Sequence, residues 1–303
     1  MKEFKNAFVA VILLTHFPAC AAAKTKSNIV VSVFSAKEAN VNAYFLSDDQ
    51  GTLIVDATRK DKDAKELAEF ARSKGVPVKM ILITHGHPDH FVGLGVLKRE
   101  FPDAKIVVAS KQIKEDIIAM ASMKWMSSEP LMQPKSEGNP NGFDYQNEIG
   151  ILDSSTLKMP GGESLEVMTD FPATEAAHET VLFSKELNAV FASDLAYNKV
   201  HLWLAGGVNA EGIKNWQTEL SRLKKRFSPL KAKVYPGHGP PTGVSVFDVD
   251  RKYMNDLLAI VKSAKTEDEA KKPMMKKYPD WQGADFILVQ SIKNQTKLLA
   301  GKE

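Results

Sequence analysis

A nearly continuous apolar run, Val78 to Thr84 (VKMILIT), constrains the fold of this chain more than any other feature. A strand that is apolar on both sides must be covered on both sides, which indicates a buried strand in a sheet flanked by other layers. The run leads directly into HGHPDH, where His85, His87 and His90 fall within six residues and Asp89 lies between the last two. Ligand sites of open α/β sheets lie where such strands end, so the histidines mark a candidate site.

The rest of the pattern predicts an α/β sandwich with mixed sheets, because an opening series of short strands is followed by alternating strands and helices. We expect strands at residues 28–35, 41–47, 51–56, 78–84, 105–109, 164–168, 180–184, 189–192 and 233–235. We expect helices at residues 62–74, 93–100, 111–123 and 211–227, and a mostly helical segment from about residue 247 to 299.

Residues 124–150 interrupt this rhythm, because they are rich in proline, glycine, asparagine and serine, which is typical of a loop. The segment also carries methionine and aromatic residues, among them Trp125, Met132 and Tyr145. Two interpretations stay open. The segment is either a lid that lines an apolar substrate pocket, or a long loop whose large side chains attach it to the core.

The first 23 residues have the layout of a secretory signal peptide, with Lys2 and Lys5 before an apolar run too short to span a membrane. A small-residue site follows, so we expect cleavage after Ala23 and a mature domain of residues 24–303 that is periplasmic or secreted. Retention as an uncleaved anchor and lipidation on Cys20 are the alternatives. No later stretch is long and apolar enough for a transmembrane helix.

Composition argues against disulfide bonds in the mature protein and against nucleic-acid binding. Cys20 is the only cysteine in 303 residues, so removal of the signal would leave no disulfide and a fold that depends on its core. The formal net charge of +3 is too small to indicate nucleic-acid binding.

The histidine cluster is a candidate metal site. With 7 histidines in the chain, the pattern H-x-H-x-D-H should arise by chance in roughly one of 5,000 chains. In a tight loop, side chains two residues apart can converge on one ion, so His85 and His87 are paired here, and Asp89 with His90. Imidazole and carboxylate ligands suit zinc, and a catalytic zinc needs about three protein ligands, so each pair is one ligand short.

Further candidate ligands lie beside later predicted strands. His178 precedes one strand in ATEAAHET, His238 follows another in VYPGHGP, and Asp194 ends a third in AVFASD. Of the remaining histidines, His16 lies in the signal and His201 has no assigned role.

The ordered set of motifs resembles the metallo-β-lactamase superfamily of metal-dependent hydrolases, and LIVDA at residues 53–57 is similar to the early strand of that family. The resemblance implies a four-layer αβ/βα sandwich with the site between two mixed sheets, and Asp56 orienting a ligand. It also implies two zinc ions per chain, one held by His85, His87 and His178, the other by Asp89, His90 and His238, with Asp194 bridging both.

The resemblance implies hydrolysis of a small molecule such as a lactone or ester, by a hydroxide that bridges the two metals. The metal bound by three histidines would polarise the carbonyl, and Asp89 would pass the proton. Tyr197 follows Asp194 by three residues, which resembles acyl-homoserine-lactone lactonases, where a tyrosine at that offset contacts the substrate carbonyl. The alternative is that Tyr197 only packs at a strand end.

Because the sequence departs from several family patterns, the motifs do not determine the substrate class. AAHET stands where many members, including glyoxalase II, have a Thr-Pro-Gly-His type sequence, and the glutathione-binding tail of glyoxalase II is not recognisable. No cysteine ligand is available, and an aspartate at position 194 differs from the cysteine-free β-lactamases. β-Lactam hydrolysis and a non-catalytic metal-binding protein remain the alternative functions.

Overall fold

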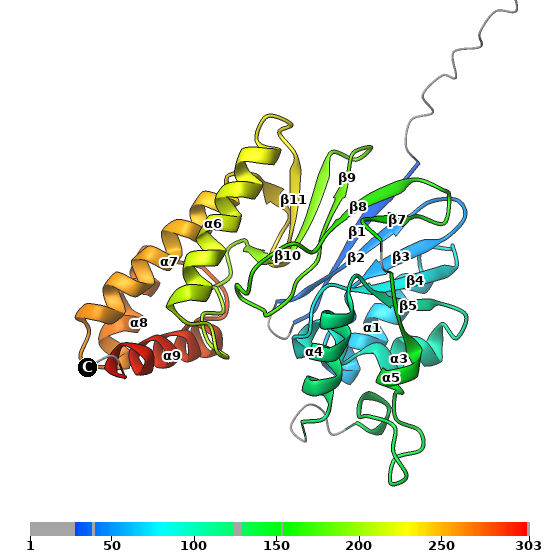
Figure 1. The fold of residues 1–303 in the computed structure, drawn as a ribbon, viewed down its shortest axis with the longest axis horizontal. Coiled ribbons are helices and arrows are strands. Elements are labelled where there is room, and N and C mark those ends of the chain that lie inside the picture. Colours follow the sequence, from blue (N-terminus) through cyan, green and yellow to red (C-terminus); the bar gives the residue numbers. More distant parts are fainter. Residues whose placement is uncertain (1–27, 38–39, 124–128, 153, 302–303) are drawn as a thin grey trace, which may run out of the picture.

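The computed structural model contains two six-stranded mixed β-sheets, with helices on the outer side of each (Figure 1). It describes residues 28–37, 40–123, 129–152 and 154–301. This is the sandwich of two helix-flanked sheets that the sequence predicted. No helix in the described ranges is both long enough and apolar enough to cross a membrane.

The first sheet places the apolar run of the sequence between other strands. Its strands, in spatial order, are β1 (Val30–Ser35), β2 (Asn42–Ser47), β3 (Thr52–Val55), β4 (Val78–Ile83), β5 (Lys105–Val108) and β6 (Ile149–Ile151). The first three strands are antiparallel, and β3 to β6 are parallel. β4 therefore pairs on both edges, and its last residues, Ile81 to Ile83, are fully buried.

The second sheet is also mixed. Its strands, in spatial order, are β12 (Thr242–Gly243), β11 (Lys233–His238), β10 (Ala189–Tyr197), β9 (Val181–Ser184), β8 (Ser164–Met168) and β7 (Thr156–Lys158). β10 and β11 are parallel, and the other neighbours are antiparallel.

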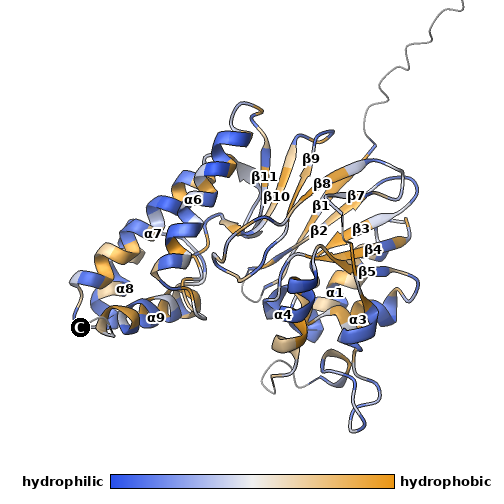
Figure 2. Cartoon of the chain, in the orientation of Figure 1, coloured by the Kyte–Doolittle hydropathy of each residue, from blue (hydrophilic) through white to orange (hydrophobic). Residues whose placement is uncertain are grey.

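The helices carry polar and apolar residues in turn along their length, whereas the central strands are mainly apolar (Figure 2). Beside the first sheet lie α1 (Asp61–Arg72), α2 (Pro88–Phe91), α3 (Leu94–Glu100), α4 (Lys111–Ala121) and α5 (Tyr145–Glu148). Beside the second lie α6 (Ala210–Phe227) and α7 (Val246–Ser263), and α8 (Glu267–Lys277) and α9 (Val289–Ala300) pack against α7 farther from the sheet. Two short single-turn elements, Pro130–Met132 and Ala284–Leu288, complete the described helices.

Successive side chains of β10 point to opposite faces of the sheet and belong to two different hydrophobic cores. Phe191 faces the first sheet, where its ring stacks on Tyr235 at 4.8 Å and meets the edge of Tyr44 at 5.5 Å. Val190 and Ala192 point the other way, into the core beneath the C-terminal helices. This period of two places the sheets face to face and leaves the ends of their strands to form a site.

The predicted end of β10 was wrong. The strand runs to Tyr197 rather than residue 192, so Asp194 lies within it instead of closing it. The pairing with β11 shifts on both sides of Ser193, which has a positive φ of 50°. Such a bulge bends a strand and changes the direction of its side chains. The strand propensity of the residues does not reveal where a bulge occurs.

The predicted lid segment falls partly outside the described residues, since residues 124–128 are not covered. In the remainder, Met132, Phe143 and Tyr145 are buried in the first core, and the Tyr145 hydroxyl donates to the Met132 carbonyl at 2.9 Å. These contacts attach residues 129–150 to the sheet. The predicted signal peptide also lies outside the described residues.

Candidate metal centre

The histidine motif occupies the turn between β4 and α2. His85 follows the end of β4, and His87 caps the amino terminus of α2, where Pro88 supplies the fixed φ that suits a first helical position. His90 lies inside that short helix, and the ring centroids of His85 and His90 are 4.2 Å apart. The tight turn therefore aims all three imidazoles into one small volume between the sheets.

Two groups of potential metal ligands converge there. The ligand atoms within each group all lie within 4.8 Å of one another. The first group consists of His85, His87, Glu175 and Asp194, and the second of Asp89, His90 and His238.

Asp194 connects the two groups. Its Oδ1 lies 3.2 Å from His90 Nε2, and its Oδ2 lies 3.2 Å from His238 Nε2. The same Oδ2 is 3.7 Å from His85 Nε2. Burial opposes ionisation of this carboxyl, but His90 and His238 hold its pKa well below the usual range. A charged carboxylate that contacts both groups is the arrangement required of a bridging ligand.

Four buried polar atoms show that these groups fit metal ions. Within the described part of the chain, no hydrogen-bond partner is found for His85 Nε2, His90 Nε2, Glu175 Oε2 or Asp194 Oδ1, although His90 Nε2 and Asp194 Oδ1 approach to 3.2 Å. Leaving one such group unsatisfied costs about 1–3 kcal/mol. All four face the same volume, where divalent cations would satisfy them together. Nitrogen and carboxylate donors of this kind are ligands for zinc and similar metals.

Neighbouring residues fix the orientation of the histidines. His85 Nδ1 lies 3.0 Å from Thr84 Oγ1 and 3.2 Å from Ser193 Oγ, which leaves Nε2 toward the site. His90 Nδ1 lies 2.9 Å from Asp56 Oδ2, and Asp56 also accepts a hydrogen bond from the Thr84 backbone at 2.9 Å. The structure thus places Asp56 where it can orient a ligand, as such outer carboxylates do in metal sites.

The structure does not bring His178 into the centre. Its Nδ1 lies 2.8 Å from Asp116 Oδ2 on α4, and its side chain is 44% exposed. Glu175, three residues earlier in the same loop, takes the inward position with its Oε1 3.0 Å from His87 Nδ1. The other six predicted ligands lie in the two groups. The sequence held one signal for this exchange of ligands, which was the departure of ATEAAHET from the usual motif, together with its two glutamates.

Burial and charge set the protonation of this loop. Burial lowers the pKa of His87, but the adjacent Glu175 carboxylate raises it to about 9. Burial raises the pKa of Glu175 itself to about 7 against the opposing effect of His87. Burial, reinforced by Glu175, holds the pKa of Glu179 well above its usual range. Glu179 Oε1 accepts from the Ala176 backbone at 3.2 Å, so this buried carboxyl braces the loop that carries Glu175.

The hydroxyl of Tyr197 contacts the Asp194 carboxylate. Its hydroxyl donates to Asp194 Oδ2 at 2.9 Å, and its ring stacks on His238 at 4.6 Å between centroids. Its backbone nitrogen donates to Asp250 Oδ2 at 2.9 Å. The side chain is only 1% exposed. In this structure the hydroxyl contacts a candidate metal ligand, and its contact with a substrate carbonyl stays a prediction.

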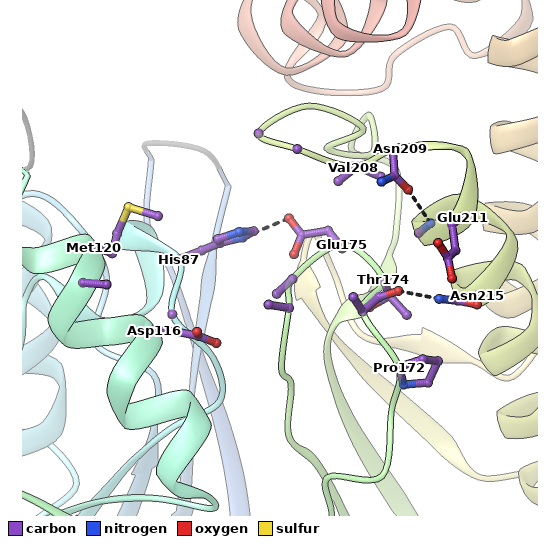
Figure 3. A pocket seen from close by; sticks show the side chains of 18 of the residues that line it. His87, Asp116, Met120, Pro172, Thr174, Glu175, Val208, Asn209, Glu211 and Asn215 are labelled. Atoms are coloured by element: carbon purple, nitrogen blue, oxygen red, sulfur yellow. Dashed lines mark hydrogen bonds and ion pairs between the residues drawn. The ribbon is translucent and has the colours of Figure 1, made fainter. Parts of the chain in front are cut away.

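A pocket of about 620 Å³ opens beside the first group of ligands, and His87 and Glu175 form part of its wall (Figure 3). In Figure 3 these two side chains point toward each other across the space between α4 and the loop that leads to β9. The volume suits a small molecule, for which pockets of roughly 300–1,000 Å³ are usual.

His201 lies away from this pocket. It is 1% exposed, its Nδ1 is 2.8 Å from the Tyr253 hydroxyl, and its ring is 6.0 Å from that of Trp281. Burial, with a smaller effect of Lys271, lowers its pKa to about 4. His201 is therefore a neutral residue of the core beneath the C-terminal helices.

Comparison with known proteins identifies relatives of this arrangement. Metallo-beta-lactamase type 2 of Bacillus cereus is 23% identical over 207 residues, which cover 68% of this chain and 70% of that protein. Hydroxyacylglutathione hydrolase of Francisella tularensis subsp. novicida (strain U112) is 26% identical over 195 residues, which cover 64% of this chain and 61% of that protein.

Solved structures share the fold. A metallo-beta-lactamase family protein from Thermus thermophilus superposes with a TM-score of 0.61 at 18% identity, covering 91% of this chain and 94% of its own. The metallo-beta-lactamase from Pontibacter korlensis superposes with a TM-score of 0.52 at 18% identity, covering 77% of this chain and 97% of its own. Residues 36–238, which contain every candidate ligand, match the profile of the Metallo-beta-lactamase superfamily. The chain belongs to the metallo-β-lactamase superfamily.

Proposed function

We propose that this protein is an exported, dinuclear zinc hydrolase that cleaves a lactone, an ester or a similar carbonyl compound. The observation that carries the proposal is the sharing of Asp194 by two buried ligand groups, one of which forms part of the wall of a small-molecule pocket. A substrate in that pocket lies directly beside the ligands, as a metal-assisted hydrolase requires.

The residues of the chain can be assigned roles in this reaction. Two divalent cations bound here would supply Lewis-acid activation of water and of the substrate carbonyl. Asp194 would hold both ligand groups in register. Asp89, the carboxylate of the second group, has a side chain 19% exposed and can take a proton from the attacking water and return it to the leaving group.

Zinc is proposed because each group combines imidazole nitrogen with carboxylate oxygen. The ligand set differs from the one that the sequence predicted, since the first group contains two histidines and two carboxylates rather than three histidines. The two groups are therefore alike in donor type, and neither is distinguished as the sole electrophilic site. Elemental analysis of purified protein should find close to two divalent ions per chain, mainly zinc.

A panel of substrates tests the reaction class. Zinc-loaded protein would be assayed against chromogenic lactone, ester, thioester, phosphodiester, sulfate ester and β-lactam compounds. We expect the highest kcat/KM on a lactone or carboxylic ester, and loss of nearly all activity in Asp194→Ala. Preference for the β-lactam would instead support the activity printed in the name of the Bacillus cereus relative. Full metal loading without turnover of any compound would support a non-catalytic metal-binding protein.

Export is a separate part of the proposal, and it is supported by the charged start, apolar run and small-residue site in residues 1–23. Protein recovered from the producing cell should begin near Lys24. Intact-mass measurement that finds Met1 retained, or a lipid on Cys20, would contradict cleavage after Ala23.

A further inference from the structure

The pocket beside the metal centre is lined by acidic side chains, although the whole protein has a formal net charge of +3. Besides the ligands His87 and Glu175, its charged lining residues are Asp116 from α4 and Glu211 from α6. Lysine and arginine are absent from the lining residues that the structure describes. Figure 3 shows Asp116 and Glu211 on opposite sides of the space, and both belong to its lining.

Two features of the wall oppose this negative charge, and neither cancels it. The amino terminus of α6 reaches the pocket and carries roughly half a positive charge. Asn209 caps it by accepting from the Gly212 nitrogen at 2.9 Å, and Glu211 in the first turn contributes a full negative charge. His178 lies 2.8 Å from Asp116 and can offset at most that one carboxylate.

The metal centre itself contributes less positive charge than a set with a third histidine would. Glu175 occupies the inward position that His178 was expected to fill, and its carboxylate lies 3.0 Å from His87. Exchanging a neutral imidazole for a carboxylate removes one unit of positive charge from the loaded site. The attraction that such a site offers to an anionic substrate is reduced by the same unit.

The remaining wall is apolar in part. Ala119, Met120 and Met123 line the side formed by α4, and Pro172 and Val208 line the opposite side. Methionine side chains adapt to irregular apolar groups, so this wall suits a hydrocarbon or aromatic portion of a ligand.

We infer that the substrate of this site is an uncharged or positively charged carbonyl compound with an apolar portion, and that Asp116 and Glu211 select against negatively charged substrates. The inference rests on the proposed hydrolase function. It names the substrate class by the charge and polarity of the pocket, with the apolar portion against Met120 and Met123 and any cationic group near the two carboxylates.

Three 4-nitrophenyl esters of equal chain length test the inference, with an ω-hydroxyl, an ω-trimethylammonium or an ω-carboxylate group on the acyl chain. At low salt, the zinc-loaded enzyme should hydrolyse the neutral and cationic esters with at least about 10-fold higher kcat/KM than the anionic ester, since each nearby carboxylate contributes about 5-fold. Raising the salt to 1 M should shrink the ratio, because it screens exposed charges.

The variants Asp116→Asn and Glu211→Gln should each reduce the ratio of kcat/KM between the neutral and anionic esters by about 5-fold, and the double variant should reduce it further, without a change in metal content. Glu115→Gln is the matched control. Glu115 lies next to Asp116 on α4 but outside the pocket lining, and its carboxylate pairs with Lys111 at 3.2 Å. The control should leave the preference unchanged.

The outcomes separate the inference from the function on which it rests. Equal turnover of the three esters, or an unchanged preference in the double variant, would overturn the inference and leave the hydrolase assignment standing. A change in Glu115→Gln as large as that in Asp116→Asn would also overturn it, because long-range charge rather than the pocket would then set the preference. No turnover of any ester by fully loaded protein would overturn both.

Discussion

A single glutamate distinguishes the ligand group that the structure brings together from the one that the sequence predicted. Glu175 and His178 belong to one short loop, and either side chain could have been a ligand by its chemistry. The loop turns Glu175 inward against His87 and leaves His178 paired with Asp116 at the surface. The sequence could not distinguish them, because the choice depends on loop conformation and on the brace that Glu179 provides to Ala176.

Tyr197 gives a prediction at the same scale. Tyr197→Phe keeps the ring that stacks on His238 and removes only the hydroxyl that donates to Asp194. Removing a residue that orients a ligand typically weakens metal binding by about 10- to 100-fold. Competition with a chromogenic chelator should therefore show weaker metal binding, with lower kcat that recovers at excess zinc. Unchanged metal affinity with a kcat that stays low at excess zinc would favour a direct contact with substrate.

The strand pair β10–β11 is the element that shapes the centre. The bulge at Ser193 turns Asp194 inward, and β11 delivers His238 beside it. The two strands can approach this closely only because residue 237 is glycine, since a Cβ there would lie 1.9 Å from Asp194 Oδ1. The sequence indicated both strands and both ligands, but pairing irregularities depend on contacts between distant segments.

Gly237→Ala tests this close approach. The added methyl group must displace the Asp194 carboxylate, so we expect loss of most bound metal and of activity. Gly243→Ala is the control in neighbouring β12, where a Cβ would meet no atom within 4 Å. Elemental analysis of both variants, with circular dichroism to verify folding, should show metal loss in the first alone. Full metal content in folded Gly237→Ala would refute the packing argument.

The layered fold of the whole molecule could largely be predicted from the hydrophobic pattern of the sequence. The continuous apolar run of β4 predicts a layered fold, because such a strand needs cover on both faces. The division of two cores by β10 was visible only in the structure. The short strands β6 and β7 were not expected, since three residues carry too little pattern to detect. Their places depend on pairing with β5 and β8.

His201 links overall stability to pH. Its pKa in the folded protein is about 4, against an ordinary value of 6.5. Between these values the unfolded chain binds the extra proton, so the free energy of unfolding falls as pH decreases from 6.5 toward 4, by at most about 3 kcal/mol. Chemical denaturation of wild type and His201→Gln at a series of pH values should show a shallower loss in the variant. Identical pH slopes would contradict the assignment of a buried neutral imidazole.

The metal content of two neighbouring variants tests the central claim, which is that two ions share Asp194 and that Glu175 completes the first site. Elemental mass spectrometry would be applied to wild type, Glu175→Ala and His178→Ala after equal zinc loading, with thermal unfolding to verify that each is folded. We expect about two ions in wild type and His178→Ala and about one in Glu175→Ala. Loss of one ion from His178→Ala, with both retained by Glu175→Ala, would contradict this assignment of ligands.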